Sequence, residues 1–176
     1  MNSQPDANLL TRALDQTAGL LDEVTPEQYD SPSTCEDWKV GHLVRHVVAS
    51  PQNFISMFAG KDVDWANPPE LGEDPAADFR SGAAALLEQV KADESGGSSN
   101  AAIPEFAVHS WDLARSTGSQ TSLDDEVAEH AYAFMSANLT PENRKGAFEP
   151  EVDAAADASV HDRLAAFAGR SPSTGG

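Results

Sequence analysis

Residues 101–118 of this chain, AAIPEFAVHSWDLARSTG, carry its most informative helical pattern. The apolar residues of this stretch fall on several sides of a helix, which we place over residues 101–116, with Asn100 as a cap at its start and Gly118 as a cap at its end. A helix that is apolar on several sides lies inside a protein and contacts other helices on more than one face. We therefore expect this helix to be the most enclosed element of an all-α fold.

Amphipathic periodicity predicts five further helices around it. Apolar residues recur at three- and four-residue steps over residues 6–24, 37–60, 76–92, 123–138 and 158–168. Pro51 falls inside the second of these helices, so we expect a kink there or a split into two segments. The pattern predicts an antiparallel four-helix bundle with short accessory helices, formed as one domain over residues 1–170, with residues 171–176 as a flexible tail.

The composition excludes two classes of partner. The chain has 176 residues and carries 29 Asp and Glu against 11 Lys and Arg, a formal net charge of −18. Nucleic acids and anionic membranes bind basic faces, so neither is an expected partner. The chain has no apolar run of membrane-spanning length and no signal-peptide pattern at its start, and its single cysteine, Cys35, allows no internal disulfide. We expect a cytoplasmic protein.

Glu105 and His109 on the enclosed helix are candidate metal ligands. They are four residues apart, which puts their Cβ atoms about 5–6 Å apart on one face. A buried carboxylate is costly unless it is paired or binds a metal. His46, which flanks the apolar stripe of the 37–60 helix, is the candidate third ligand. Two histidines and one carboxylate without a fourth protein ligand make an open site that suits zinc and can also hold iron or nickel.

Other interpretations of the histidines stay open. A single helical histidine is more often a surface or hydrogen-bonded residue than a ligand. His42 and His46 form a second pair four residues apart, which could bind a metal themselves. His130 and His161 lie in acidic amphipathic segments, where we expect them to be solvated.

Three residues near these candidates have competing roles. For Cys35, in a loop before the second helix, we favour a structural role over a nucleophilic one. We expect Trp111 to pack rather than to stack on a substrate. Asp112 either orients a ligand histidine or pairs with an arginine.

Three stretches of the chain carry motifs of a known family. The first is STCEDWKV, residues 33–40, followed by Leu43 and His46; the second is EFAVHSWDLA, residues 105–114. They resemble the Cys-x-Asp-Trp-x-Val-x-x-Leu-x-x-His segment and the Glu-x-x-x-His-x-Trp-Asp-Leu-Ala signature of the mycothiol-dependent maleylpyruvate isomerase N-terminal family, of the DinB-like superfamily. The third stretch, from Asp162-Arg163-Leu164 to Gly169-Arg170-Ser171-Pro172, together with Gly146-Ala147-Phe148, resembles an actinobacterial-type subgroup.

The resemblance implies a DinB-like four-helix bundle in which His46, Glu105 and His109 hold a metal. Family members use a low-molecular-weight thiol, mycothiol or bacillithiol, in isomerisation or S-transfer. Coordination to a divalent metal deprotonates a thiol and makes it a nucleophile. We therefore expect a metal-dependent S-transferase or isomerase whose partners are a mycothiol-type thiol and a small electrophile. The alternative is a non-catalytic metal- or ligand-binding module with a structural or sensory role, and both a monomer and a homodimer are compatible with the sequence.

Overall fold

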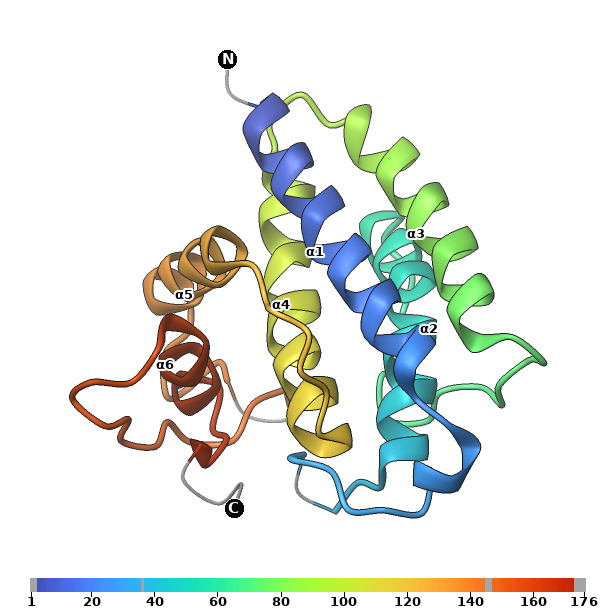
Figure 1. Cartoon of the computed structure of the whole chain (residues 1–176). Helices are drawn as coiled ribbons and strands as arrows, with labels where there is room; N and C mark the ends of the chain where they lie inside the picture. Colours follow the sequence, from blue (N-terminus) through green and yellow to red (C-terminus); the bar gives the residue numbers. More distant parts are fainter. Residues whose placement is uncertain (1–2, 36, 145–146, 173–176) are drawn as a thin grey trace.

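Six α-helices and no strand make up the part of the chain that the computed structural model describes, residues 3–35, 37–144 and 147–172. The predicted all-α fold is confirmed. In chain order the elements are α1 (Ser3–Glu23), a 3-10 turn η1 (Pro26–Gln28), α2 (Val40–Phe58), α3 (Pro75–Lys91), α4 (Gly97–Thr117), α5 (Asp125–Asn138) and α6 (Val160–Phe167) (Figure 1). Residues 173–176 of the predicted tail and Gly146 of the quoted motif lie outside the described residues.

Helices α1 to α4 form a bundle in which each helix contacts two neighbours. α1 and α2 each pack against both α3 and α4 (Figure 1). The α1·α3 and α2·α4 pairs are antiparallel, as predicted. The α1·α4 and α2·α3 pairs instead run in the same direction, so the antiparallel prediction is correct for two of the four contacts.

The connection 59–74 explains this departure. α2 has 19 residues and is about 28 Å long at 1.5 Å per residue. The connection, when extended, can span about 50 Å. It therefore returns the chain to the end of the bundle where α2 began, and α3 starts there (Figure 1).

The start of α4 differs from the prediction, and α2 excludes one of the two outcomes expected at Pro51, the split. α4 begins at Gly97 rather than at residue 101, because the Asp93 carboxylate accepts hydrogen bonds from the backbone N–H groups of Ser95 and Ser98 at 3.0 and 2.9 Å and takes the capping role that we expected for Asn100. α2 is one helix through Pro51 and is not split. Pro51 packs closely on Gly82 of α3, where an added Cβ would lie 3.2 Å from the proline Cβ, and this contact supports α2 at the proline.

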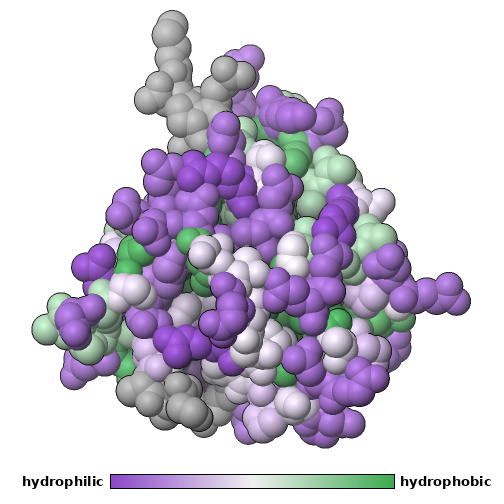
Figure 2. Space-filling view, viewed as in Figure 1, coloured by the Kyte–Doolittle hydropathy of each residue, from purple (hydrophilic) through white to green (hydrophobic). Residues whose placement is uncertain are grey.

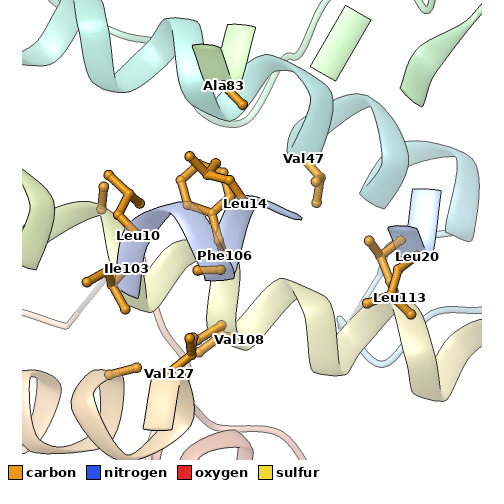
Figure 3. Close-up of a cluster of buried hydrophobic side chains, with 14 of the residues drawn as sticks. Leu10, Leu14, Leu20, Val47, Ala83, Ile103, Phe106, Val108, Leu113 and Val127 are labelled. Carbon is orange, nitrogen blue, oxygen red and sulfur yellow. The ribbon is translucent and has the colours of Figure 1, made fainter. Parts of the chain in front are cut away.

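The core is built on two faces of α4, as the sequence predicted. Ile103 and Phe106, both fully buried, face the bundle, where the Phe106 ring lies 5.9 Å from the ring of Phe79 (Figure 3). Val108 faces Val127 of α5 on another side (Figure 3). α5 and α6 pack on α4 and on each other, away from α2 and α3 (Figure 1). They add a second layer to the bundle.

Truncation of a core leucine should measure what this packing contributes. Leu14 of α1 is 2% exposed, so Leu14→Ala should lower the free energy of unfolding by about 3 kcal/mol through lost burial and the cavity left behind. Leu9, on the same helix but only partly buried, is the matched control, and Leu9→Ala should cost less. Urea denaturation measures both. Equal losses would contradict the assignment of Leu14 to the core.

The surface agrees with the acidic composition. Figure 2 shows a face covered mainly by hydrophilic residues, with small separate apolar patches. Among the described residues, Met57 is the large hydrophobic residue that is exposed, at 40%. No helix in the described part of the chain has the length and apolar content that a membrane span requires.

Candidate functional site

The antiparallel packing of α2 against α4 brings the three predicted ligand residues together. His46 Nε2 lies 2.7 Å from Glu105 Oε1, and His109 Nε2 lies 3.4 Å from the same oxygen. One donor atom from each residue lies within 4.8 Å of the others. The side chains are 8%, 15% and 8% exposed, so the group is largely enclosed but not sealed.

The two histidines are held in one orientation. His46 Nδ1 lies 3.2 Å from the backbone carbonyl of Trp65, which can only accept a hydrogen bond, so Nδ1 donates. His109 Nδ1 donates to Asp112 Oδ2 at 2.9 Å. Both Nε2 atoms therefore face Glu105. Metal-binding histidines are commonly oriented by a carbonyl or a carboxylate on the second ring nitrogen in this way.

The electrostatics of the group favour a cation at its centre. Burial opposes ionisation of Glu105, but the charges of His109 and His46 and hydrogen bonds from His46 and Ser50 outweigh it and lower its pKa to about 2. Burial alone would lower the pKa of His46, but Glu105 raises it. With both Nδ1 atoms donating, a proton on Nε2 balances the Glu105 carboxylate in the metal-free protein, and a cation in its place would meet two Nε2 lone pairs and a carboxylate oxygen. That arrangement needs positive charge, so the residues present fit a divalent metal.

The group lies in the wall of a cavity of about 920 Å³. His46, Glu105 and His109 all line it, together with Trp38 and Trp65. The Trp38 ring lies 4.9 Å from the His46 ring and 6.4 Å from the His109 ring. A small molecule in this cavity would therefore be in contact with the candidate ligands.

Asp112 joins α4 to two distant segments behind His109. It is fully buried and accepts hydrogen bonds from Thr34 at 2.6 Å and from Arg170 Nε and Nη2 at 3.2 and 2.9 Å, in addition to that of His109. Burial opposes its ionisation, but Arg170 and His109 hold the pKa of Asp112 well below its usual value. The two roles predicted as alternatives, orienting a histidine and pairing with an arginine, occur together.

Cys35 belongs to this second group and is a poor nucleophile. Its thiol donates to Asp112 Oδ2 at 3.3 Å, and burial, followed by the Asp112 charge, raises its pKa. Cys35, His109 and Asp112 form another set of donor atoms within 4.8 Å of one another. Arg170 and Thr34 already occupy the Asp112 oxygens, however, and the guanidinium would repel a metal ion there.

The raised thiol pKa predicts slow alkylation of Cys35. At pH 8, iodoacetamide should modify the native protein at least about tenfold more slowly than the protein in urea, because the thiolate is the reactive form. Mass spectrometry of quenched time points measures both rates. Equal rates would contradict the hydrogen-bonded, protonated thiol.

The remaining histidines lie outside the candidate centre. The His42 ring lies 4.4 Å from the Trp38 ring, tilted by 41°, and His42 lines a separate surface pocket rather than the cavity. His130 and His161 are partly buried and bond to Asn100 and Asp125 at 2.6 and 2.9 Å. The prediction that these two are solvated is therefore wrong, because tertiary packing gives each of them a partner.

Trp111 packs, as predicted. It is 3% exposed, and its Nε1–H donates to Asp162 of α6 at 2.9 Å. It does not line the cavity.

Three contributors to the site were not predicted from the sequence. Ser50 donates to Glu105 Oε1 at 2.7 Å, and its position four residues after His46 could have indicated it. Arg170 lies in the motif near the end of the chain, which by itself indicates no role for the side chain. The carbonyl of Trp65 carries no sequence signal, because any residue offers the same backbone oxygen.

Comparisons with known proteins give a family match and two similar proteins. The family described as "Mycothiol maleylpyruvate isomerase N-terminal domain" matches residues 10–114, which include all three candidate ligands and end before α5. Two proteins of Mycobacterium tuberculosis, from strains CDC 1551 / Oshkosh and ATCC 25618 / H37Rv, are each 28% identical over 176 residues, which is 90% of this chain and 94% of the relative. Both are described as uncharacterized. No solved structure gives a significant match.

Proposed function

The chain belongs to the mycothiol maleylpyruvate isomerase N-terminal domain family, and from this premise we propose that it is a divalent-metal-dependent enzyme acting on a mycothiol-type thiol and a small electrophile. The reaction is S-transfer or isomerisation. Both begin with the same bond, from the thiol sulfur to an electrophilic carbon. In S-transfer a leaving group departs with the bonding electrons, whereas in isomerisation the sulfur leaves again after rotation.

One observation carries this proposal. Two imidazole Nε2 atoms and one carboxylate oxygen meet in the wall of a cavity of about 920 Å³, and both Nδ1 atoms are already bound to acceptors. Among the described residues no fourth His, Cys, Asp or Glu joins this group. His46, Glu105 and His109 would hold the metal and leave a position that faces the cavity. This ligand set suits zinc.

The chain's own residues orient the candidate ligands. The Trp65 carbonyl and Asp112 hold the two imidazoles with Nε2 toward the centre. Ser50 holds the Glu105 carboxylate. A divalent ion at this point would supply the positive charge that deprotonates a thiol, whose pKa in water is about 8.5. The cavity would hold the electrophile beside the sulfur, which favours reaction by proximity.

An open position argues for a catalytic rather than a structural metal. Structural zinc sites are closed by four protein ligands. His42, which the sequence offered as a partner of His46 in an alternative metal pair, lines a different pocket. The non-catalytic module proposed as the alternative therefore has less support from the geometry.

Metal-dependent conjugation tests the proposal. Protein purified without a histidine tag is mixed with mycothiol and the fluorescent electrophile monobromobimane, with and without chelator. Only a few per cent of such a thiol is thiolate at pH 7, so the metal-loaded protein should react about tenfold faster or more than the chelated protein. Zinc added back should restore the rate. Equal rates with and without chelator would reject the proposed function.

A further inference from the structure

We propose that the cavity selects an uncharged electrophile with an apolar, ring-sized body and rejects substrates that carry carboxylates. That the ligand is an electrophile rests on the proposed function. The preference of the cavity for uncharged ligands follows from its walls alone. Two observations carry it: which residues form the walls, and how the charged groups among them are already paired.

Apolar side chains from two separate parts of the chain line the cavity. One set comes from α2 and the connection after it, through Phe54, Met57 and Trp65. The other comes from α5 and the segments that follow it, through Phe134, Leu139 and Phe148. The second set lies outside residues 10–114, where the family match ends. The C-terminal part of the chain therefore contributes its own half of the substrate surface.

The cationic side chain at the cavity already has a negatively charged partner. Arg170 is the only Lys or Arg among the described residues that line the cavity. Its Nε and Nη2 bind Asp112, its Nη1 donates to the carbonyl of Ala168, and its side chain is 11% exposed. Asp112 neutralises the charge of the guanidinium, so Arg170 would attract a carboxylate of the substrate only weakly. Glu149, which is exposed and also lines the cavity, adds negative charge.

The candidate metal centre does not change this balance. The two positive charges of a divalent ion would be offset by Glu105 and by the incoming thiolate. The hydroxyls of Ser33 and Thr34 and the amide of Asn138, which also line the cavity, already donate to Cys35, Asp112 and Phe134. A carboxylate on the electrophile would then be placed among mostly apolar walls without a free cation, which is unfavourable. The net charge of −18 adds long-range repulsion of anions.

A pair of fluorescent probes tests this directly. N-phenyl-1-naphthylamine is uncharged, and 8-anilino-1-naphthalenesulfonate has the same two ring systems with a sulfonate added. Energy transfer from the tryptophans that line the cavity reports binding of either probe to the metal-free protein. We expect the uncharged probe to bind about tenfold more tightly or more, since the sulfonate finds no free cation.

Matched variants assign the preference to the cavity. Ala101 of α4 lines the cavity, and Ala92 at the end of α3 is exposed elsewhere. Ala101→Trp should weaken binding of the uncharged probe about tenfold or more by filling the space, and Ala92→Trp should leave it unchanged. Glu149→Lys should reduce the ratio of the two probes' dissociation constants at least about threefold, because it adds a cation at the cavity. Glu73→Lys makes the same charge change at an exposed position outside the cavity and should leave this ratio unchanged.

Each outcome decides the inference. Selective binding that is lost in Ala101→Trp and narrowed in Glu149→Lys supports it. Equal affinities for the two probes, or binding that Ala101→Trp does not affect, overturn it. Neither probe needs a thiol or a metal. A failed conjugation assay with intact probe selectivity would therefore reject the proposed function while the cavity's preference stands.

Discussion

His109→Ala should reduce the divalent metal that co-purifies with the protein from about one equivalent to about none. His109 offers one of three donor atoms, and its ring is fixed by the hydrogen bond to Asp112. Two remaining donors bind a metal much more weakly than three. Elemental analysis of protein purified without a histidine tag measures the stoichiometry.

His130→Ala is the matched control for this result. His130 lies on α5, bonds to Asn100 and is not part of the three-residue group. The metal content should therefore stay unchanged. Metal added to wild-type protein at about 100 times its dissociation constant should also stabilise it by about 2.7 kcal/mol, and His109→Ala should lose this gain. Equal metal content in the two variants would refute the choice of ligands.

Asp112→Asn should lower the free energy of unfolding of the metal-free protein by about 3–5 kcal/mol. Asp112 is fully buried and carries the counter-charge for Arg170, which is itself enclosed. The amide would leave the guanidinium without a negative partner in the interior and would weaken the hydrogen bonds from Thr34 and His109. Urea denaturation in the presence of chelator measures the loss.

Two comparisons make this prediction specific. Asp22 pairs with Arg80 at an exposed position, and Asp22→Asn should have no measurable effect, because surface ion pairs contribute little. The double variant Asp112→Asn/Arg170→Gln should lose less than the sum of the two single variants, by about 1–3 kcal/mol, because the residues act as a pair. Strict additivity would contradict the ion pair.

The same pair predicts a pH dependence with a definite sign. The folded-state pKa of Asp112 is lowered, so its stabilisation is present above the unfolded pKa of about 3.9 and is lost as the pH falls through the lower folded value. The difference in stability between wild type and Asp112→Asn should thus be constant from neutral pH down to about pH 4 and shrink below it. A difference that shrinks as the pH rises would contradict the prediction.

Local sequence patterns were enough to predict most of the secondary structure. The three- and four-residue repeats located all six helices, because burying one face requires apolar residues at that spacing. The largest error at a helix start came at Gly97, where the side chain of Asp93 accepts a hydrogen bond from the amide of Ser98 in the first turn of α4. The parallel orientation of α3 relative to α2 was not predicted either, because helix periodicity contains no information on the path of the connection 59–74.

The candidate site, too, has one part that local sequence predicts and another that depends on the packing of the helices. Glu105 and His109 could be paired from sequence because four residues on a helix place two side chains on one face. That His46 lies 2.7 Å from Glu105 is a property of the packing of α2 on α4. The roles of Arg170 and the Trp65 carbonyl depend on segments that are 58 and 19 residues from their partners.

The helices, the acidic surface and the three candidate ligands could thus be predicted from the sequence. Which atoms hold those residues in place, and which charges at the cavity are already paired, followed from the packing of the helices and loops. The physical reason is range. Helix periodicity acts between neighbours along the chain, whereas the partner of a buried charge is set by packing between segments that the chain brings together only when it folds.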